Sequence, residues 1–165
     1  MEKSADVQGL IKALGEPRVQ RSASRRSSVI IGLKRLRASE AIPTLGKILS
    51  ADPNDIVRTH AARALGEMGD AEALGPLRAA LDDDSERVQM WAMNSLGRLR
   101  DRESVPLISL KLEHDDWGCR AYAADALREI GDERAIPALT KAVGDENSTV
   151  RQAASRALRE LGVSV

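Results

Sequence analysis

Apolar residues recur along this chain at the spacing of one helical face. Between residues 57 and 68, the apolar positions fall at i, i+4, i+8 and i+11, namely Val57, Ala61, Leu65 and Met68. Positions with that spacing form a single stripe along an α-helix. Apart from Ala62, Ala64 and Gly66, polar and charged residues fill the remaining positions, so the segment is predicted to be an amphipathic helix with one buried face.

The same helical segment returns every 31 residues. One column of equivalent positions contains Val57, Val88, Cys119 and Val150, and a second contains Leu65, Leu96, Leu127 and Leu158. A shorter helical pattern precedes each segment and has a proline near its start, where a missing N–H costs little; these are Pro43, Pro76, Pro106 and Pro137. A degenerate copy precedes them all. The period predicts a single domain over residues 1–165, with repeats at about 1–40, 41–72, 73–103, 104–134 and 135–165.

One helix pair cannot bury both of its apolar faces, so the pairs must stack on one another. The predicted fold is therefore all-α: an α-solenoid, or α-α superhelix, of about five stacked antiparallel helix pairs. The composition agrees, because the chain has no Phe, one Tyr and two Trp. Columns of small Ala residues let neighbouring helices approach closely, at the short end of the usual spacing of about 8–10 Å.

Charge and cysteine content argue against several other classes. Lys+Arg and Asp+Glu both number 25, and this balance argues against nucleic acid or an anionic membrane as the partner. No apolar run approaches the ~20 residues of a membrane helix. Cys119 is the one cysteine, which leaves no disulfide framework and no cysteine metal site. We expect a cytoplasmic protein with no metal, no cofactor and no membrane contact.

The repeats resemble a known family. The pattern A-[IV]-P-x-L-x-x-[AL]-[LV], followed by [VC]-R-x-x-A-A-x-A-L-[GR]-x-[IL]-G-D, is similar to the short HEAT-like repeats of the phycobilisome-lyase type. The resemblance covers residues 41–165 well and residues 1–40 weakly. It implies a binding scaffold, occasionally an enzyme, in which the second helix of each pair lines the concave face and the first helix the convex face.

Charged columns of the repeat predict structural contacts. Four arginines occupy one column, in which Gln89 is the exception: Arg26, Arg58, Arg120 and Arg151. Acidic residues recur in the turns before that column, at Asp52, Asp84, Asp115 and Glu146. The fork of an arginine suits bridging the turns and carboxylates of adjacent repeats. We expect a structural ladder rather than catalysis, and we expect Cys119 to be a small buried hydrophobe.

Large side chains with polar tips gather in another column of the second helices. His60, Trp91 and Tyr122 occupy it in three consecutive repeats, although Ala, Leu, Ile and Val suffice for the core. Aromatic rings flanked by arginine are typical of a binding hot spot; the alternative is that they merely cover Ala-rich gaps. Trp117, in a turn, is expected to cap the edge of the array. The predicted partner-binding residues are His60, Arg63, Met90, Trp91, Asn94, Tyr122, Asp125 and Arg156.

The first copy is the basic part of the chain. Residues 1–40 hold nine Lys/Arg and four Asp/Glu. This excess predicts either a docking patch for an anionic partner or a solvated, mobile loop of a capping repeat. The candidate patch consists of Arg18, Arg21, Arg25, Arg35 and Arg37.

Signatures of catalysis are nearly absent. The chain has no phosphate-cradling glycine loop, nucleophile elbow or zinc spacing. It also lacks the His-Glu dipeptides of HEAT-like enzymes of the deoxyhypusine-hydroxylase type, because Ala61 follows His60 and Glu113 precedes His114. The sequence favours a non-catalytic scaffold for protein–protein interaction. The alternatives are a phycobilin-lyase-like or chaperone-like factor for a tetrapyrrole protein, and docking of an anionic partner at the basic first repeat.

The last helical segment ends in LRELGVSV and lacks, as read from this stretch, the polar outer face of a terminal cap. We expect Leu158, Leu161 and Val163 to form an apolar patch there. Such a patch predicts self-association through the C-terminal repeat.

Overall fold

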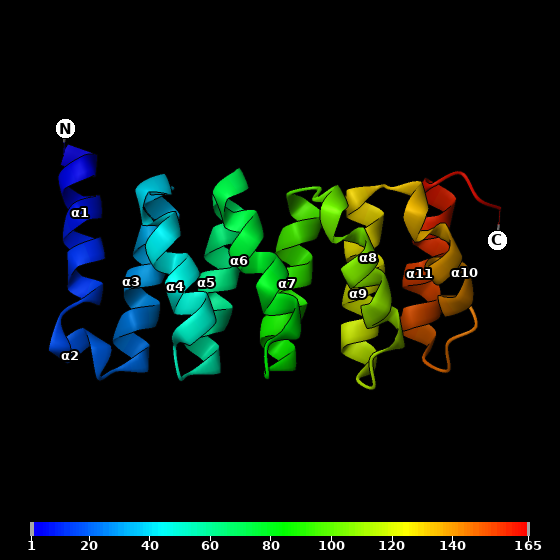
Figure 1. The fold of residues 1–165 in the computed structure, drawn as a ribbon, viewed down its shortest axis with the longest axis horizontal. Helices are drawn as coiled ribbons and strands as arrows, with labels where there is room; N and C mark the ends of the chain where they lie inside the picture. Colours follow the sequence, from blue (N-terminus) through cyan, green and yellow to red (C-terminus); the bar gives the residue numbers. More distant parts are fainter. Residues whose placement is uncertain (1, 165) are drawn as a thin grey trace.

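The computed structural model describes residues 2–164, which contain eleven α-helices, six short 3-10 helices and no strand. Besides the short α2 (Pro17–Gln20), the helices form five pairs (Figure 1). These pairs are α1 (Glu2–Leu14) with α3 (Ala23–Leu36), α4 (Ile42–Ala51) with α5 (Asp55–Met68), α6 (Leu74–Ala79) with α7 (Glu86–Arg98), α8 (Val105–Leu110) with α9 (Trp117–Ile130), and α10 (Ile136–Ala142) with α11 (Ser148–Glu160). None of these helices is long and apolar enough to cross a membrane.

The pairs stand in a row, with α1 at one end and α11 at the other (Figure 1). In the layer of second helices, α5 packs between α3 and α7, and α9 packs between α7 and α11. In the other layer, α4 contacts α6 and α8 contacts α10. Four of the 3-10 helices connect successive pairs: Ser39–Ala41, Ala71–Ala73, Arg102–Ser104 and Glu133–Ala135. The prediction of an all-α solenoid is confirmed.

Local signals fix where the second helices begin and end. The side chain of Asn54 accepts a hydrogen bond from Val57 N at the start of α5 (3.2 Å), and that of Asp116 accepts one at the start of α9 (2.8 Å). These side chains satisfy N–H groups that have no partner within the helix. The same two helices end at Gly69 and Gly131, whose φ angles of 79° and 69° lie in the left-handed region that favours glycine.

Small residues bring the second helices into backbone contact. A Cβ atom added to Gly66 on α5 would lie 2.4 Å from Ser95 Cβ on α7, and one added to Gly97 on α7 would lie 3.0 Å from Ala126 Cα on α9. The alanine column between these helices is fully buried: Ala61, Ala92, Ala123 and Ala154. A core this thin has no room for phenylalanine, which accounts for the composition.

Cys119 belongs to this core, as predicted. Its side chain is fully buried, and burial raises the pKa of its thiol to about 12. The thiol therefore stays protonated at neutral pH and lacks the thiolate that nucleophilic chemistry needs.

Candidate functional site

The column of large side chains occupies three successive second helices. His60 on α5, Trp91 on α7 and Tyr122 on α9 follow one another along the array. His60 and Trp91 are half-buried, whereas Tyr122 is 37% exposed. We refer to these three residues and to Arg63, Asn94 and Asp125, one turn further along the same helices, as the second-helix ridge.

A stacked pair joins two repeats within the ridge. The guanidinium carbon of Arg63 on α5 lies 5.1 Å from the centre of the Trp91 ring on α7, within the range of a cation–π interaction. Arg63 Nε also donates to Glu67 Oε1 at 2.7 Å, and Lys34 Nζ on α3 lies 3.1 Å from Glu67 Oε2. The side chain of Arg63 is thus held from two sides, by the Trp91 ring and by the Glu67 carboxylate.

His60 is neutral at physiological pH. Burial lowers the pKa of its imidazole below the ordinary value, and the nearby charges of Arg63 and Lys34 lower it further. A neutral imidazole has one donor and one acceptor nitrogen, so His60 can present either to a ligand.

The structure places the remaining candidates less uniformly. Asp125 on α9 lies 3.8 Å from Arg156 on α11, which continues the neighbouring column into the fifth repeat. Met90, by contrast, points into the space left by Gly118, because a Cβ there would lie 2.9 Å from Met90 Cε. Met90 is half-buried and packs at the boundary between α7 and α9.

Two further apolar side chains on the second helices are exposed and were not among the candidates. Trp117, expected to cap the array, is 50% exposed at the first residue of α9. Ile56 is 47% exposed and precedes His60 by four residues, so both lie on one face of α5. In the sequence, Ile56 could have been noticed because the equivalent positions of the third and fourth repeats are not large and apolar; they are Arg87 and Gly118.

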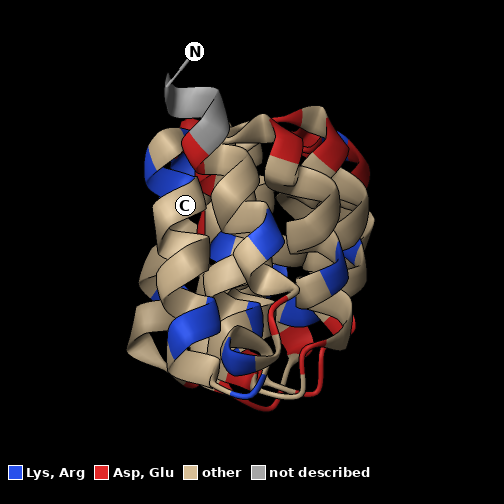
Figure 2. Cartoon of the chain, turned by 90° about the vertical axis from the view of Figure 1, so that its left-hand side faces the viewer, with Lys and Arg blue, Asp and Glu red and all other residues tan. Residues whose placement is uncertain are grey.

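The predicted basic patch divides in two. Arg18, Arg21 and Arg25 are exposed around α2 and the first turn of α3. Arg35 lies in the last turn of α3, ten residues and hence about 15 Å further along the axis, and Arg37 follows it. Figure 2 views this end of the array and shows acidic residues concentrated in the connecting turns.

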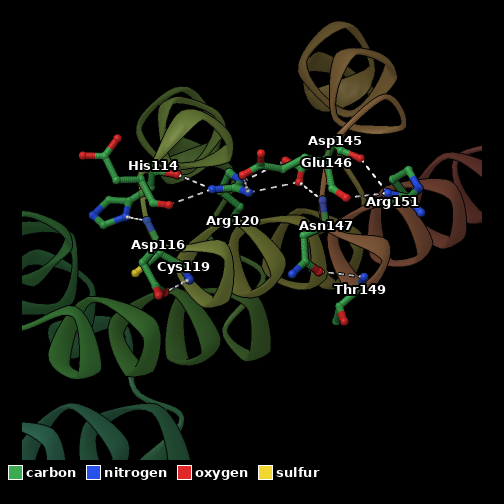
Figure 3. Close-up of polar contacts among 10 residues, drawn as sticks. His114, Asp116, Cys119, Arg120, Asp145, Glu146, Asn147, Thr149 and Arg151 are labelled. Atoms are coloured by element: carbon green, nitrogen blue, oxygen red, sulfur yellow. Dashed lines mark hydrogen bonds and ion pairs between the residues drawn. The ribbon is translucent and has the colours of Figure 1, made fainter.

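The arginine ladder is present; Asp52 is an acceptor as predicted, whereas the other acceptors differ from those predicted. Each bridge joins an arginine to the first acidic residue of the next repeat's turn, and we call each bridge a rung. The rungs are Arg26 with Asp52 (2.6 and 2.8 Å), Arg58 with Asp83 (2.8 and 2.8 Å), and Arg120 with Asp145 (2.8 and 3.0 Å; Figure 3). In each rung, Nε and Nη2 of the arginine donate to the two carboxylate oxygens, which is the strong bidentate geometry.

The other three acids predicted as acceptors play minor parts. Asp84 and Glu146 are secondary partners of the rung arginines and are 87% and 89% exposed. Asp115 contributes only its backbone oxygen, which accepts from Arg120 Nη1 (2.9 Å). The true acceptors also receive a backbone N–H two residues further on, such as Asn147 N to Asp145 Oδ1 at 2.8 Å. That local bond turns the first acid of each turn toward the arginine.

In the rung between the third and fourth repeats, both the arginine and the aspartate are replaced. Where the ladder would have arginine and aspartate, the third and fourth repeats have Gln89 and His114. Gln89 keeps the inner bond, since its Nε2 donates to Asp83 O at 2.7 Å. His114 keeps the turn, since its Nδ1 accepts from Asp116 N at 3.0 Å (Figure 3). This neutral rung preserves the local hydrogen bonds without the charges.

Restoring the charged rung tests this interpretation. In the double variant Gln89→Arg, His114→Asp, we expect the free energy of unfolding to rise by about 1 kcal/mol. In Gln89→Arg alone, it should fall by about 1–3 kcal/mol, because a buried guanidinium then lacks a carboxylate. Urea denaturation followed by circular dichroism measures all variants, with His114→Asp completing the double-mutant cycle. Additive single effects would contradict the pairing.

The fifth repeat has a polar outer face, contrary to the prediction. Leu158 is fully buried, and Leu161 and Val163 are half-buried because the chain folds back, with Val163 N donating to Leu158 O (2.9 Å). The side of α11 turned away from α9 forms a shallow hollow lined by Ser148, Arg151, Gln152, Ser155, Arg156 and Arg159. The predicted apolar patch is wrong, and self-association through the C-terminal repeat stays a prediction that this patch does not support.

Comparisons with known proteins agree with this geometry. A family model described as HEAT repeats matches residues 7–93, 42–109 and 76–159. No curated protein matches the chain significantly. Among solved structures, the complex of CpcE and CpcF of phycocyanin lyase from Nostoc is similar, with 25% identity and a TM-score of 0.80 over 94% of this chain and 64% of that one. The chain thus spans less than two thirds of the lyase chain that it matches.

Two more distant structures share the fold. A designed armadillo repeat protein in complex with the peptide (KR)4 has 20% identity and a TM-score of 0.69, over 92% of this chain and 80% of that one. Human deoxyhypusine hydroxylase has 16% identity and a TM-score of 0.52, over 94% and 84%. At these identities the likeness concerns the fold alone.

Proposed function

This chain belongs to the HEAT repeat family, and from that premise we propose that it is a non-catalytic scaffold that binds another protein on the concave face formed by its second helices. The observation that carries the proposal is the stack of Arg63 on Trp91 across two repeats, beside Tyr122 on the next helix. A stacked cation and ring restrict each other's motion in the free protein, which reduces the entropy cost of binding a partner.

The composition of the ridge supports a protein ligand. Tyr, Trp and Arg are the residues most enriched in binding hot spots, and the aliphatic core does not require them for filling. The exposed Ile56, which lies on the same face of α5 as His60, extends the apolar area. The peptide held by the designed armadillo repeat protein is a further argument for a polypeptide ligand on this fold.

Site-specific photo-crosslinking tests the proposal. A benzophenone amino acid at position 94, beside the stacked pair, is expected to capture one major protein from an extract of the native source. The matched control places the same group at position 110 on α8, where Leu110 is 71% exposed on the first-helix layer. Adding Tyr122→Ala should reduce the yield at position 94 by about tenfold, as for a hot-spot residue.

The same experiment can also contradict the proposal. Equal capture from positions 94 and 110, or a yield that Tyr122→Ala leaves unchanged, would contradict binding along the ridge. Thermal melting of the Tyr122→Ala variant provides the stability control. Tyr122 is exposed, so its loss should leave the melting temperature nearly unchanged.

A lyase-like role is the second candidate, and the likeness to the phycocyanin lyase complex favours it. In this role, too, the chain would bind another protein, namely one that carries a tetrapyrrole. Incubation of the chain with a bilin and phycocyanin apoprotein separates the two functions. A shifted visible absorption band would contradict the non-catalytic scaffold and support a lyase-like factor. An unchanged spectrum would support the scaffold.

A further inference from the structure

Arg151 on α11 repeats the inner geometry of the rung arginines. Its Nη1 donates to the backbone oxygens of Asp145 and Glu146, both at 2.8 Å. Arg120 Nη1 makes the equivalent pair of bonds to the preceding turn, at 2.8 and 2.9 Å. Figure 3 shows the two arginines in successive repeats, each anchored to its own turn. The guanidinium of Arg151 is therefore held in place before any ligand arrives.

The outer half of this guanidinium differs from that of the rungs. Nε and Nη2 of Arg120 donate to the carboxylate of Asp145 in the next repeat. For Arg151, no side-chain carboxylate of residues 6–164 lies within ion-pair distance, and its side chain is exposed. The guanidinium that makes a bidentate ion pair in three other repeats is thus held in position in the fifth repeat, without such a partner among the described side chains.

The surface around Arg151 has the charge that such a contact needs. The hollow on the outer side of α11 has a volume of about 410 Å³ and is lined by polar side chains, among them Arg151, Arg156 and Arg159. No carboxylate lines it. Two of these positions are small and apolar in the fourth repeat, which has Ala121 where α11 has Gln152 and Ala124 where α11 has Ser155. This end of the array is therefore shaped for a polar, anionic ligand.

We propose that the outer face of α11 docks an acidic turn of a partner protein, with one aspartate carboxylate held by Nε and Nη2 of Arg151. The contact continues the ladder across the boundary between two proteins. It is separate from the ridge and does not depend on the function proposed for it.

A second copy of this chain is a poor occupant for the same surface. The position equivalent to the rung aspartate in the first repeat is Gln20, whose backbone oxygen accepts from Arg26 Nη1. Around it lie the exposed Arg18, Arg21 and Arg25. Head-to-tail stacking would bring these arginines against those of α11, so like charges oppose it.

An NMR titration of the full chain tests the contact. The probe is the capped peptide LDDDSERV, residues 81–88, whose third residue is the rung acceptor Asp83. The Nε–Hε signal of Arg151 is expected to shift saturably at millimolar peptide and more than the signals of Arg156 and Arg159. A peptide with asparagine at its third residue should bind about tenfold more weakly, because it offers no carboxylate at that position.

The variant Arg151→Gln is the matching change in the protein, since Gln89 shows that glutamine keeps the inner bond of a rung. It should weaken binding as much as the asparagine peptide does, whereas the control Arg159→Gln should leave binding nearly unchanged. Equal shifts at all three arginines, or equal binding by wild type and Arg151→Gln, would overturn the proposal. Such results would indicate diffuse attraction between an acidic peptide and a basic surface.

Discussion

Arg58→Ala is expected to lower the free energy of unfolding by about 3–5 kcal/mol, the range for breaking one partner out of a buried ion pair. Arg58 and Asp83 are both about 90% buried, and the arginine satisfies both oxygens of that carboxylate. It also donates to Asp52 O at 2.8 Å. Its removal leaves a buried carboxylate without a counter-charge between the second and third repeats. Urea denaturation monitored by circular dichroism measures the loss.

An exposed arginine provides the matched control for this variant. Arg102 is 72% exposed and lies 3.9 Å from Asp132, so Arg102→Ala should change the free energy of unfolding by less than about 0.5 kcal/mol. Similar losses for Arg58→Ala and Arg102→Ala would mean that the rungs do not hold the repeats together.

The rungs also give the stability a defined pH dependence. The hydrogen bonds from Arg120 hold the pKa of Asp145 below its ordinary value; at Asp83, burial alone would raise the pKa, but the bonds from Arg58 outweigh it and the pKa is again lowered. A carboxyl group whose pKa is lower in the folded state stabilises that state at any pH above its unfolded pKa of about 3.9. This stabilisation disappears as the pH falls through the folded pKa. Below about pH 4, wild type should therefore lose more stability than Arg58→Ala.

Gly66→Ala is expected to cost about 3 kcal/mol, at the upper end of the usual range for overpacking. The new Cβ would lie 2.2 Å from Ser95 Oγ and 2.9 Å from Ser95 Cα. The backbone of α7 must move to relieve the contact, and Ser95 Oγ would lose its hydrogen bond to Ala62 O (3.0 Å). This loss outweighs the gain of up to about 1 kcal/mol that alanine brings to a helix interior.

The chain supplies its own control for this second variant. An added Cβ at Gly75 on α6 meets nothing within 4 Å, so Gly75→Ala should be neutral or slightly stabilising. Introducing Ser95→Gly into the Gly66→Ala background should restore part of the loss, because it removes the nearest two atoms. Thermal melts of the four proteins suffice for the comparison. A Gly66→Ala protein as stable as Gly75→Ala would show that the two helices separate easily.

Periodicity made the fold predictable, because each stripe of apolar residues has a repeat of 31 and no other arrangement buries all of them. The arginine column was predictable for the same reason. Except for Asp52, its acceptors were not, since Asp83 and Asp84 are equally acidic in sequence. Only the folded turn distinguishes them, through the hydrogen bond from Ser85 N to Asp83 Oδ1 (2.9 Å).

The candidate site was predictable as a column and not as a set of contacts. The spacing placed His60, Trp91 and Tyr122 on successive helices, but it could not show that Arg63 stacks on Trp91, since that depends on side-chain rotamers across a repeat boundary. The outer face of the fifth repeat was missed for a different reason. Its polar character comes from positions such as Gln152 and Ser155, which precede the final apolar stretch.

The neutral rung has a consequence for how this array could have grown. A repeat that carries both aspartate and arginine, such as 41–72, can be duplicated in place with every rung still matched. Copying the third repeat alone would set Gln89 opposite a second Asp83, and copying the fourth alone would set Arg120 opposite a second His114. Each single duplication strands one buried charge, whereas the two repeats copied together strand none. The third and fourth repeats, residues 73–134, can therefore be duplicated with all rungs matched only as a pair. The second and fifth repeats can each be duplicated alone.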